Sequence, residues 1–360
     1  MDITITRTQN PKTKPTDESK LGFARIFTDH MFIVEYDQGK GWHDARIVPY
    51  GPLSLDPASP IFHYAQEIFE GTKVYRLADG EVGSFRLRDN ARRMNRSADR
   101  LCMPPLDENV QVDAIARLVD LDRDWVPGSE GTSLYIRPTM ISDGCSLGAN
   151  SANRFIYFVI CAPTGSYYAE GMKPIRIRIE QRYVRAVKGG MGRAKTGGNY
   201  AASFKATKEA MDDGFSQVLW LDGREQKYVE EVGAMNMMFV VDNKILTAEL
   251  GDTILPGVTR DSVITLAREH GIEVEERRIS VSELYQAHAE GRLTEAFGTG
   301  TAAVISPVGE LQYMGESIII NNKEIGPMSQ FFYDTLTSLQ RQKAEDTHGW
   351  TAVIPHFTKE

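Results

Sequence analysis

Several segments of the chain carry the hydrophobic patterns of β-strands. Residues 31–36 are apolar and β-prone, and residues 175–179 (IRIRI) alternate isoleucine with arginine at a period of two. The pair Asp79-Gly80 inside 73–88 is typical of a hairpin turn. Further strands are expected at 133–141, at 154–162 and in the runs QVLWL, KYVEE, MMFVV, KILTAEL and AAVISPV.

Other segments carry the three-and-four spacing of amphipathic helices. We expect an arginine-rich helix over 88–100, ended by Pro104-Pro105, because its apolar residues recur on one face. Helices are also expected over 200–211, 258–270 and 281–290, each stopped by a glycine. Ser280 and Glu283 have the spacing of a capping box for the last of these helices.

The order of these elements predicts a mixed α/β (α+β) class, since strands and helices alternate without a long regular βαβ repeat. Residues 163–174 combine turn formers with aromatic residues, which indicates a domain boundary. We therefore expect an N-terminal domain over 1–166, with 1–20 flexible, a loop over 167–174 and a C-terminal domain over 175–360.

Composition narrows the class of function. The 360 residues are 41% hydrophobic and carry a net charge of -8, which disfavours the capture of nucleic acid or an anionic membrane. Residues 1–20 contain no apolar run suited to a secretory signal, and no later run is long enough to cross a membrane, so a cytoplasmic location is expected. Cys102, Cys145 and Cys161 are odd in number and far apart, which favours reduced thiols over disulfides or a metal site.

One lysine has unusual neighbours. Residues 188–200 read KGGMGRAKTGGNY, so five glycines surround Lys195. Glycine permits positive φ angles and close backbone approach. Such a cluster marks either an irregular functional loop or a flexible surface turn, and composition alone favours the surface turn.

A phosphate-binding P-loop is a second interpretation of this segment. From Gly189 the chain reads G-x-x-x-x-A-K-T, and residues 218–222 (VLWLD) could supply an acidic partner. Two features oppose it: Ala194 replaces the glycine before the lysine, and Gly197-Gly198 are expected to break the helix that a P-loop must begin there.

Motifs spread over about 45–342 resemble the branched-chain amino acid aminotransferases, which are pyridoxal phosphate enzymes of fold type IV. They are HYAQEIFEGTKVYR, DNARRMNRSADRL, LYIRP, RAKTGGNYAAS, LWLDG, VEEVGAMN, ILPGVTR and FGTGTAA, in that order. The resemblance implies a smaller N-terminal α/β domain and a larger C-terminal cofactor-binding domain, with pyridoxal phosphate between them. It also implies reversible ping-pong transfer of the amino group of L-leucine, L-isoleucine or L-valine to 2-oxoglutarate.

The resemblance assigns the cofactor residues. Lys195 matches the Schiff-base lysine, which shuttles the proton between the substrate α-carbon and the cofactor. Glu231 matches the acid at the pyridine nitrogen, and Tyr200 the phenol at the ring oxygen O3′. The phosphate donors implied are Arg93, the backbone amides of Val258 and Thr259, and the hydroxyl of Thr301.

Each of these residues also has an ordinary interpretation. Glu231 stands beside Glu230, and adjacent acids usually lie on a solvated surface. Tyr200 has the spacing of a core position. Arg93 shares its predicted helix with other arginines, among them Arg92, Arg96 and Arg100, so only the motif register singles it out.

The resemblance assigns substrate residues as well. The backbone amides of Thr301 and Ala302 would take the α-carboxylate, and Arg137 would take the distal carboxylate of glutamate. Tyr64 would be lent across a dimer interface, which implies a homodimer. The apolar walls of the side-chain pocket would be Phe69, Tyr135 and Tyr167. No metal is expected.

The chain departs from some relatives of this type. Ala234 replaces a threonine near the ring, and Ala303 and Ser306 occupy the places of paired cysteines, so no thiol switch is expected. D-amino acid aminotransferases and aminodeoxychorismate lyases share the lysine and the glutamate, and they remain alternatives within the fold. A non-catalytic binding module is disfavoured, because it has no use for the whole residue set.

Overall fold

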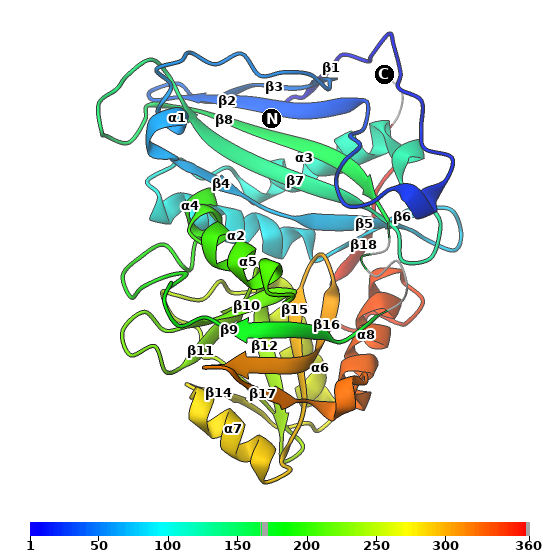
Figure 1. The fold of residues 1–360 in the computed structure, drawn as a ribbon. Helices are drawn as coiled ribbons and strands as arrows, with labels where there is room; N and C mark the ends of the chain where they lie inside the picture. The colour runs from blue at the N-terminus through cyan, green and yellow to red at the C-terminus, as the bar shows by residue number, and fades with distance from the viewer. Residues whose placement is uncertain (166, 168–171, 358–360) are drawn as a thin grey trace. The chain divides into compact units, whose positions relative to one another are not determined.

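The computed structural model describes residues 1–165, 167 and 172–357. Contacts divide the chain into two compact units (Figure 1). Unit 1 comprises Met1–Ala169, Ala194–Gly197 and Ser338–Glu360, and unit 2 comprises Glu170–Arg193 and Gly198–Thr337. The short segment that carries Lys195 thus packs with the N-terminal part of the chain. The domain limits inferred from the sequence stay a prediction.

Unit 1 contains a nine-stranded sheet in the order β1-β3-β2-β8-β7-β5-β6-β18, with β4 paired to β7. Its strands are β1 (Thr4–Ile5), β2 (His30–Asp37), β3 (Gly41–Pro49), β4 (Glu67–Phe69), β5 (Thr72–Arg76), β6 (Val82–Phe85), β7 (Ser133–Asp143), β8 (Arg154–Thr164) and β18 (Thr351–Val353). The hairpin predicted at Asp79-Gly80 is confirmed: β5 and β6 are antiparallel, and Gly80 has a φ of 88°.

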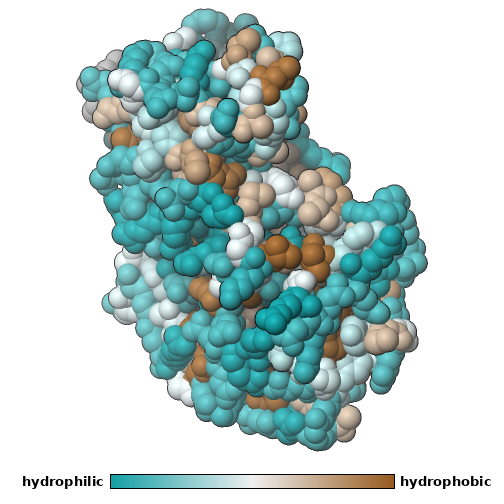
Figure 2. All heavy atoms as spheres, turned by 90° about the vertical axis from the view of Figure 1, so that its left-hand side faces the viewer, coloured by the Kyte–Doolittle hydropathy of each residue, from teal (hydrophilic) through white to brown (hydrophobic). Residues whose placement is uncertain are grey.

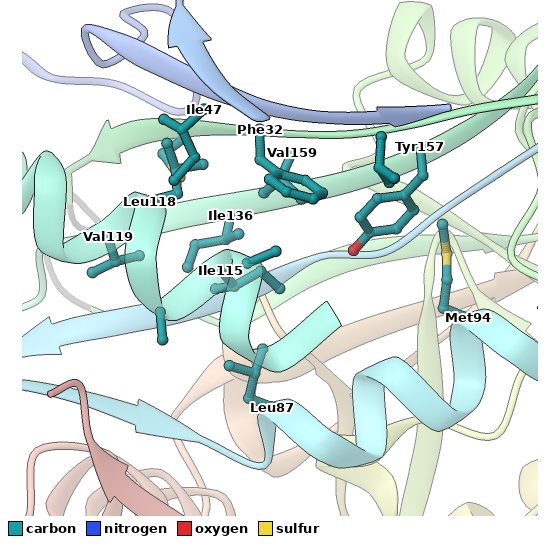
Figure 3. Packing of buried hydrophobic residues seen from close by; sticks show 14 of the residues in the cluster. Phe32, Ile47, Leu87, Met94, Ile115, Leu118, Val119, Ile136, Tyr157 and Val159 are labelled. Carbon is teal, nitrogen blue, oxygen red and sulfur yellow. The ribbon is translucent and has the colours of Figure 1, made fainter. Parts of the chain in front are cut away.

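The helices of unit 1 pack on this sheet. They are α1 (Pro60–Tyr64), α2 (Leu87–Arg100) and α3 (Glu108–Leu121), with 3-10 turns at Glu18–Lys20 and Arg123–Trp125. Figure 3 shows Met94 of α2 and Leu118 of α3 among the core residues, together with Phe32 and Tyr157 from the strands. Fully buried apolar side chains such as Phe32, Met94 and Leu118 each stabilise the fold by roughly 1.5–3 kcal/mol. The core therefore fixes α2, and with it the residues on its inner face.

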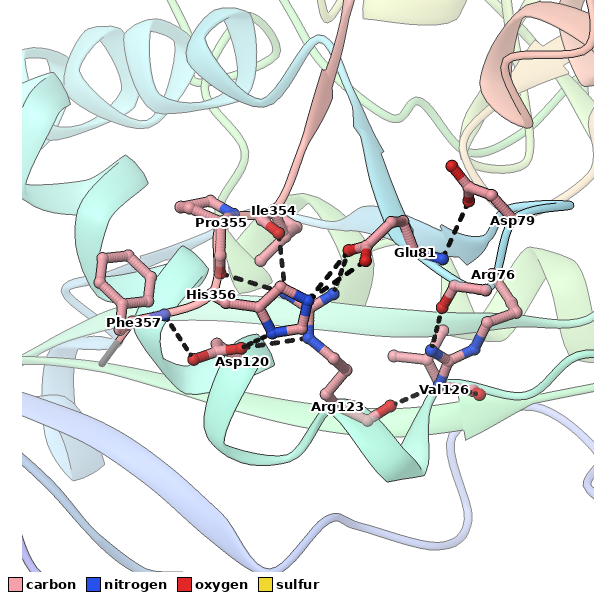
Figure 4. A network of polar contacts seen from close by, with 11 residues as sticks. Arg76, Asp79, Glu81, Asp120, Arg123, Val126, Ile354, Pro355, His356 and Phe357 are labelled. Atoms are coloured by element: carbon pink, nitrogen blue, oxygen red, sulfur yellow. Dashed lines mark hydrogen bonds and ion pairs between the residues drawn. The ribbon is translucent and has the colours of Figure 1, made fainter. Parts of the chain in front are cut away.

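The chain end returns to unit 1. Strand β18 pairs with β6, and Arg123 then binds the backbone carbonyls of Ile354 and Pro355 at 2.7 and 3.1 Å (Figure 4). His356 lies 3.2 Å from Glu81, which also pairs with Arg123 at 3.0 Å. The last described residues are thus held by side chains of the N-terminal part.

Unit 2 contains a second nine-stranded sheet in the order β11-β10-β9-β16-β15-β12-β13-β14, with β17 on β16. Its strands are β9 (Ile175–Ile179), β10 (Gln217–Leu221), β11 (Val229–Val232), β12 (Met235–Val241), β13 (Lys244–Thr247), β14 (Val274–Glu276), β15 (Leu293–Gly300), β16 (Val304–Tyr313) and β17 (Glu316–Ile319). Strand β11 also pairs with β12, so the strands from β11 to β12 form a closed ring. Closure leaves no open edge within that ring.

The helices of unit 2 include both confirmed and corrected predictions. They are α4 (Gly197–Ala201), α5 (Phe204–Asp212), α6 (Val258–Glu269), α7 (Val281–Ala289) and α8 (Pro327–Gln340), with a 3-10 turn at Asn321–Lys323; α4 and α8 each begin or end in unit 1. The single helix predicted over 200–211 is wrong, because two turn residues separate α4 from α5. Ser280 accepts the amide of Glu283 at 3.1 Å as predicted, but the Glu283 carboxylate pairs with Arg277 at 2.6 Å.

The prediction that Gly197-Gly198 break a helix is also wrong. These glycines are the first two residues of α4. The first amides of a helix need acceptors from outside it, and the Glu67 carboxylate accepts the Gly197 amide. That objection to a P-loop therefore fails, while the replacement by Ala194 still opposes one.

Among the described residues, no helix is long and apolar enough to cross a membrane. No group of three or more His, Cys, Asp or Glu residues could hold a metal there.

Cys102 and Cys145 are exposed and Cys161 is buried, all as free thiols. One face of the molecule is largely hydrophilic, with separate hydrophobic side chains between polar ones (Figure 2).

Candidate active site

The Lys195 segment is fastened to unit 1 by its own backbone. The Lys195 amide donates to the Ser97 hydroxyl at 2.9 Å, and its carbonyl accepts the Phe69 amide at 3.0 Å. Ser97 lies on α2 and is fully buried. The Glu67 carboxylate holds the Gly197 amide. A flexible surface turn would not have these attachments, so the segment is an ordered loop.

Four predicted residues meet around one aromatic ring of unit 1. The Phe69 ring centroid lies 5.0 Å from Lys195 Nζ and 4.7 Å from Arg137 Cζ. Arg137 Nη2 donates to the Tyr135 hydroxyl at 2.9 Å. A Cβ at Gly71 would overlap that hydroxyl, so glycine is required beside it. Two cations over one ring form an electropositive, half-apolar surface suited to a carboxylate or an apolar group.

Arg93 is the buried arginine of α2. Its exposed fraction is 4%, whereas Arg92, Arg96 and Arg100 are exposed. Its Nε and Nη2 atoms bind the Glu70 carboxylate at 2.7 and 2.9 Å. A bidentate pair fixes the plane of the guanidinium. Because a guanidinium has five N–H donors, this orientation is compatible with a second anion on the same group.

In unit 2, Glu231 is held by several donors. Arg185 Nε lies 2.9 Å from Glu231 Oε2, and the Leu255 amide donates to Oε1 at 2.7 Å. Asn236 Nδ2 lies 3.4 Å from the same Oε1 atom. Glu231 is 3% exposed, so this carboxylate is buried rather than solvated. The paired guanidinium and the donated hydrogen bonds favour its charged form.

The neighbouring Glu230 has a different environment. Alternation along β11 turns it to the other face of the strand, where it lines a surface pocket of about 440 Å³ with Asp222 and Asp252. Its Oε1 accepts the Thr253 hydroxyl at 2.5 Å, and its Oε2 is buried without a hydrogen-bond partner in the described part of the chain. Burial raises the pKa of the Glu230 carboxyl. Of the two adjacent acids, Glu231 is therefore the one equipped to carry a charge.

The start of α6 follows closely after Leu255, the residue whose amide binds Glu231. Helix α6 begins at Val258, and its N-cap Gly257 contributes no side-chain cap. Asn236 Oδ1 occupies the place of a Cβ at Gly257, so a larger residue would displace it. Leu255, which donates to Glu231, precedes Gly257 by two residues. The segment that binds the acid thus leads directly into a helix start, a place in a protein that favours an anion.

The predicted carboxylate turn joins β15 to β16. Thr301 and Ala302 lie in this turn, and Val304 follows with a φ of 63°. Thr299 of β15 pairs with Asn236 of β12, and Asn236 contacts Glu231. The turn therefore begins two residues after a neighbour of Asn236. The Thr299 hydroxyl is buried and has no hydrogen-bond partner among the residues described.

The remaining predicted residues, Tyr64, Tyr167, Tyr200 and Thr259, lie on separate segments of the chain. Tyr64 on α1 is 44% exposed, and its hydroxyl donates to the Leu147 carbonyl at 2.5 Å. Tyr167 is 49% exposed. Tyr200 lies on α4, where its carbonyl accepts the Ser203 hydroxyl at 2.6 Å. Thr259 is buried in the first turn of α6.

Sequence reasoning missed the partners of these residues, namely Glu67, Glu70, Ser97, Arg185 and Asn236. A signal for one of them exists: two acids in the otherwise apolar strand VEEV require a buried cation. No comparable signal identifies Ser97 or Asn236, because a buried serine or asparagine is recognised only from the backbone groups that it meets.

The family model "Amino-transferase class IV" matches residues 67–311. Branched-chain-amino-acid aminotransferase 2 of Bacillus subtilis is 50% identical over 99% of this chain and 98% of its own length. Branched-chain-amino-acid transaminase 1 of the same organism is 51% identical over 95% and 96%. A solved structure of the T.th. branched-chain amino acid aminotransferase, complexed with N-(5'-phosphopyridoxyl)-L-glutamate, has a TM-score of 0.73 and 28% identity, covering 90% of this chain and 98% of its own.

These similarities extend over nearly the whole chain rather than one motif, and they agree with the mixed α/β fold described above. They confirm the resemblance that the ordered motifs indicate. The chain belongs to the class IV aminotransferase family.

Proposed function

We propose that this chain is a pyridoxal phosphate-dependent branched-chain amino acid aminotransferase. It transfers the amino group of L-leucine, L-isoleucine or L-valine to 2-oxoglutarate, giving the branched 2-oxo acid and L-glutamate. The observation that carries the proposal is 50% identity over almost the full length to a Bacillus subtilis enzyme of that name. The ordered Lys195 loop and the buried Glu231 supply the chemistry that such an enzyme needs.

The donor set fits the cofactor. Pyridoxal phosphate carries a phosphate and a ring nitrogen, so it needs anion donors at one end and an acid at the other. Glu231 is a buried acid, and the start of α6 is a helix end whose glycine cap has no side chain. Arg93, the amides of Val258 and Thr259 and the Thr301 hydroxyl would hold the phosphate. Tyr200 would donate to the ring oxygen.

Proton transfer falls to Lys195. Bound pyridoxal phosphate supplies an electron-withdrawing ring that stabilises negative charge at the substrate α-carbon. The Lys195 amine takes the α-proton and returns it during the amino transfer, which requires a fixed approach to that carbon. The backbone bonds to Ser97 and Phe69 provide the fixed position.

The charge on Glu231 supports the ring. A carboxylate facing the pyridine nitrogen keeps that nitrogen protonated, and a protonated ring withdraws electrons more strongly. Arg185 pairs with Glu231 from the protein side. Its role is to keep this carboxylate ionised and oriented in a buried position.

Substrate binding uses both anion-binding groups and apolar walls. The turn amides of Thr301 and Ala302 would take the α-carboxylate, which is common to all the substrates. Phe69, Tyr135 and Tyr167 would form the apolar walls for the branched side chains. Arg137 would bind the distal carboxylate of glutamate in the other half-reaction.

The assembly and location are also part of the proposal. We propose a homodimer in which Tyr64 is lent to the partner's site; this tyrosine is 44% exposed, beside Phe62 and Leu147, which are 60% and 63% exposed. A cytoplasmic location and the domain limits 1–166 and 175–360 are proposed on the sequence grounds given above.

The test is a coupled assay with the cofactor-loaded protein. Leucine plus 2-oxoglutarate should yield glutamate, and D-alanine should not replace leucine. Turnover with D-alanine alone would favour a D-amino acid aminotransferase. Tight ATP binding by a colourless protein would instead favour the P-loop interpretation.

A further inference from the structure

Glu67 lies on the same face of the sheet as the two cations that meet at Phe69. Strands β4 and β7 are antiparallel, with Phe69 opposite Thr139. Side chains two residues apart share a face, so Glu67 lies on the face of Phe69 and Arg137 on the face of Thr139. All of these side chains therefore project from one side of the sheet in unit 1.

Two attachments fix Glu67 in place. Its carboxylate accepts the Gly197 amide, and its backbone carbonyl accepts the Thr196 hydroxyl at 2.7 Å. A Cβ at Gly197 would overlap the carboxylate, which shows how closely the two groups approach. The carboxylate is thus held at the loop that carries Lys195, two residues away.

Arg137 has no acidic side chain as an ion-pair partner among the residues that the structure describes. Within the described part of the chain it forms no ion pair at 4.0 Å or less, and its Nε is buried without a hydrogen-bond partner. Burial raises the pKa of the Glu67 carboxyl above its ordinary value, although the hydrogen bond from the Gly197 amide and then the charge of Arg137 act in the opposite direction. The two groups are therefore coupled through space rather than by direct contact.

We propose that Glu67 is a positioning residue that sets the preference between acidic and aliphatic substrates by acting on Arg137. Its negative charge offsets that of Arg137 when an aliphatic side chain occupies the pocket. The same charge weakens the attraction of Arg137 for a distal carboxylate, so that neither half-reaction is favoured strongly. This inference rests on the function proposed above, which gives Arg137 its substrate.

The Glu67→Gln variant separates charge from attachment. Its amide oxygen can still accept the Gly197 amide, but the negative charge is gone. We expect the KM for glutamate and 2-oxoglutarate to fall about three- to tenfold and the KM for leucine to rise, with kcat changed less than twofold. Glu130→Gln makes the same charge change at an exposed site of unit 1 and should leave both KM values unchanged.

Equilibrium binding gives a readout that needs no turnover. On the cofactor-loaded protein, glutarate should bind Glu67→Gln more tightly than the wild type, while 4-methylpentanoate should not. In an Arg137→Met background, Glu67→Gln should have no effect on glutarate, because the coupling partner is absent. Glu67→Met, also neutral, should shift glutarate binding in the same direction and serves if the glutamine variant does not fold.

The outcomes are distinguishable. If the wild type does not convert leucine and 2-oxoglutarate, the proposed function fails, yet glutarate binding still decides the role of Glu67. Unchanged glutarate affinity in both neutral variants overturns the inference. So does an effect of Glu67→Gln that persists without Arg137, since it would then not act through that guanidinium.

Discussion

Arg185 Nε lies 2.9 Å from Glu231 Oε2, and the two side chains are 7% and 3% exposed. The same guanidinium binds the Thr253 carbonyl at 2.8 Å and approaches the Gly192 carbonyl at 3.4 Å. Arg185 thus links Glu231 on β11 to two separate backbone segments, one at Thr253 and one at Gly192. This arrangement explains how a glutamate can stay charged in a buried strand.

Replacing Arg185 by methionine should destabilise the protein strongly. Glu231 would be left buried without its cation, which costs about 3–5 kcal/mol. Urea unfolding of the cofactor-free protein should show the loss, and cofactor affinity should fall with it. Arg224→Met, at an exposed arginine of unit 2, is the matched control. An Arg185→Met midpoint equal to that of the wild type would show that the pair contributes nothing to stability.

Glu231→Gln should keep the cofactor and lose turnover. Glutamine still accepts the Leu255 amide but cannot hold the ring nitrogen protonated by charge. We expect kcat to fall on the order of a hundredfold or more, as when a preorganised electrostatic group is removed. Cofactor content measured by absorbance, beside initial rates, distinguishes this from simple loss of binding. Unchanged kcat would remove the role assigned to Glu231.

Ser97→Ala tests the attachment of the lysine loop. The Lys195 amide would lose its acceptor at a fully buried position, which costs about 1–3 kcal/mol when the donor stays unsatisfied. We expect a lower melting temperature and a lower kcat with little change in KM. Ser54→Ala, at an exposed serine of unit 1, should change none of these. A variant with normal kcat would show that the loop does not need this bond.

Local sequence patterns predicted helices and strands better than they predicted contacts between distant residues. Period-two alternation identified 175–179 as a strand because alternation is a property of adjacent residues. Helix α3 was missed because Val110, Val112 and Ala114 alternate like a strand before the helical spacing begins. A side-chain pattern cannot show that tertiary contacts will favour the helix there.

The sequence indicated candidate site residues but not the residues that they contact. Motif order selected Arg93 from the arginines of its helix, and its burial agrees with that choice. The roles assigned to the site residues stay predictions. What the sequence could not supply were the long-range partners: Glu70 lies 23 residues from Arg93, and Ser97 lies 98 residues from Lys195. Such pairs depend on how the sheet brings distant segments together.

Glu310 should make the free energy of unfolding depend on pH in the acid range. Hydrogen bonds from Arg176, and then from Lys323 and Ser317, outweigh the opposing effect of burial and lower the pKa of Glu310 from 4.5 to about 2. A depressed carboxyl pKa contributes stability that is fully present above pH 4.5 and is lost as the pH falls toward about 2. Glu310→Gln should therefore lower the free energy of unfolding at neutral pH.

The difference in the free energy of unfolding between wild type and Glu310→Gln should shrink as the pH falls from 4.5 toward about 2. Urea unfolding of both proteins at several pH values measures it. Glu316→Gln, at an exposed carboxylate on β17, is the control. A difference that stays constant across the acid range would contradict the assigned pKa.

The most direct test of the proposed function compares wild type and Lys195→Ala, both loaded with pyridoxal phosphate, in the formation of glutamate from leucine and 2-oxoglutarate. The wild type should turn over, and the variant should lose at least about a hundredfold in kcat, because no other base is assigned to the α-proton. Circular dichroism should show that both proteins are folded. Equal rates from the two proteins would contradict the account, because Lys195 would then not move the proton.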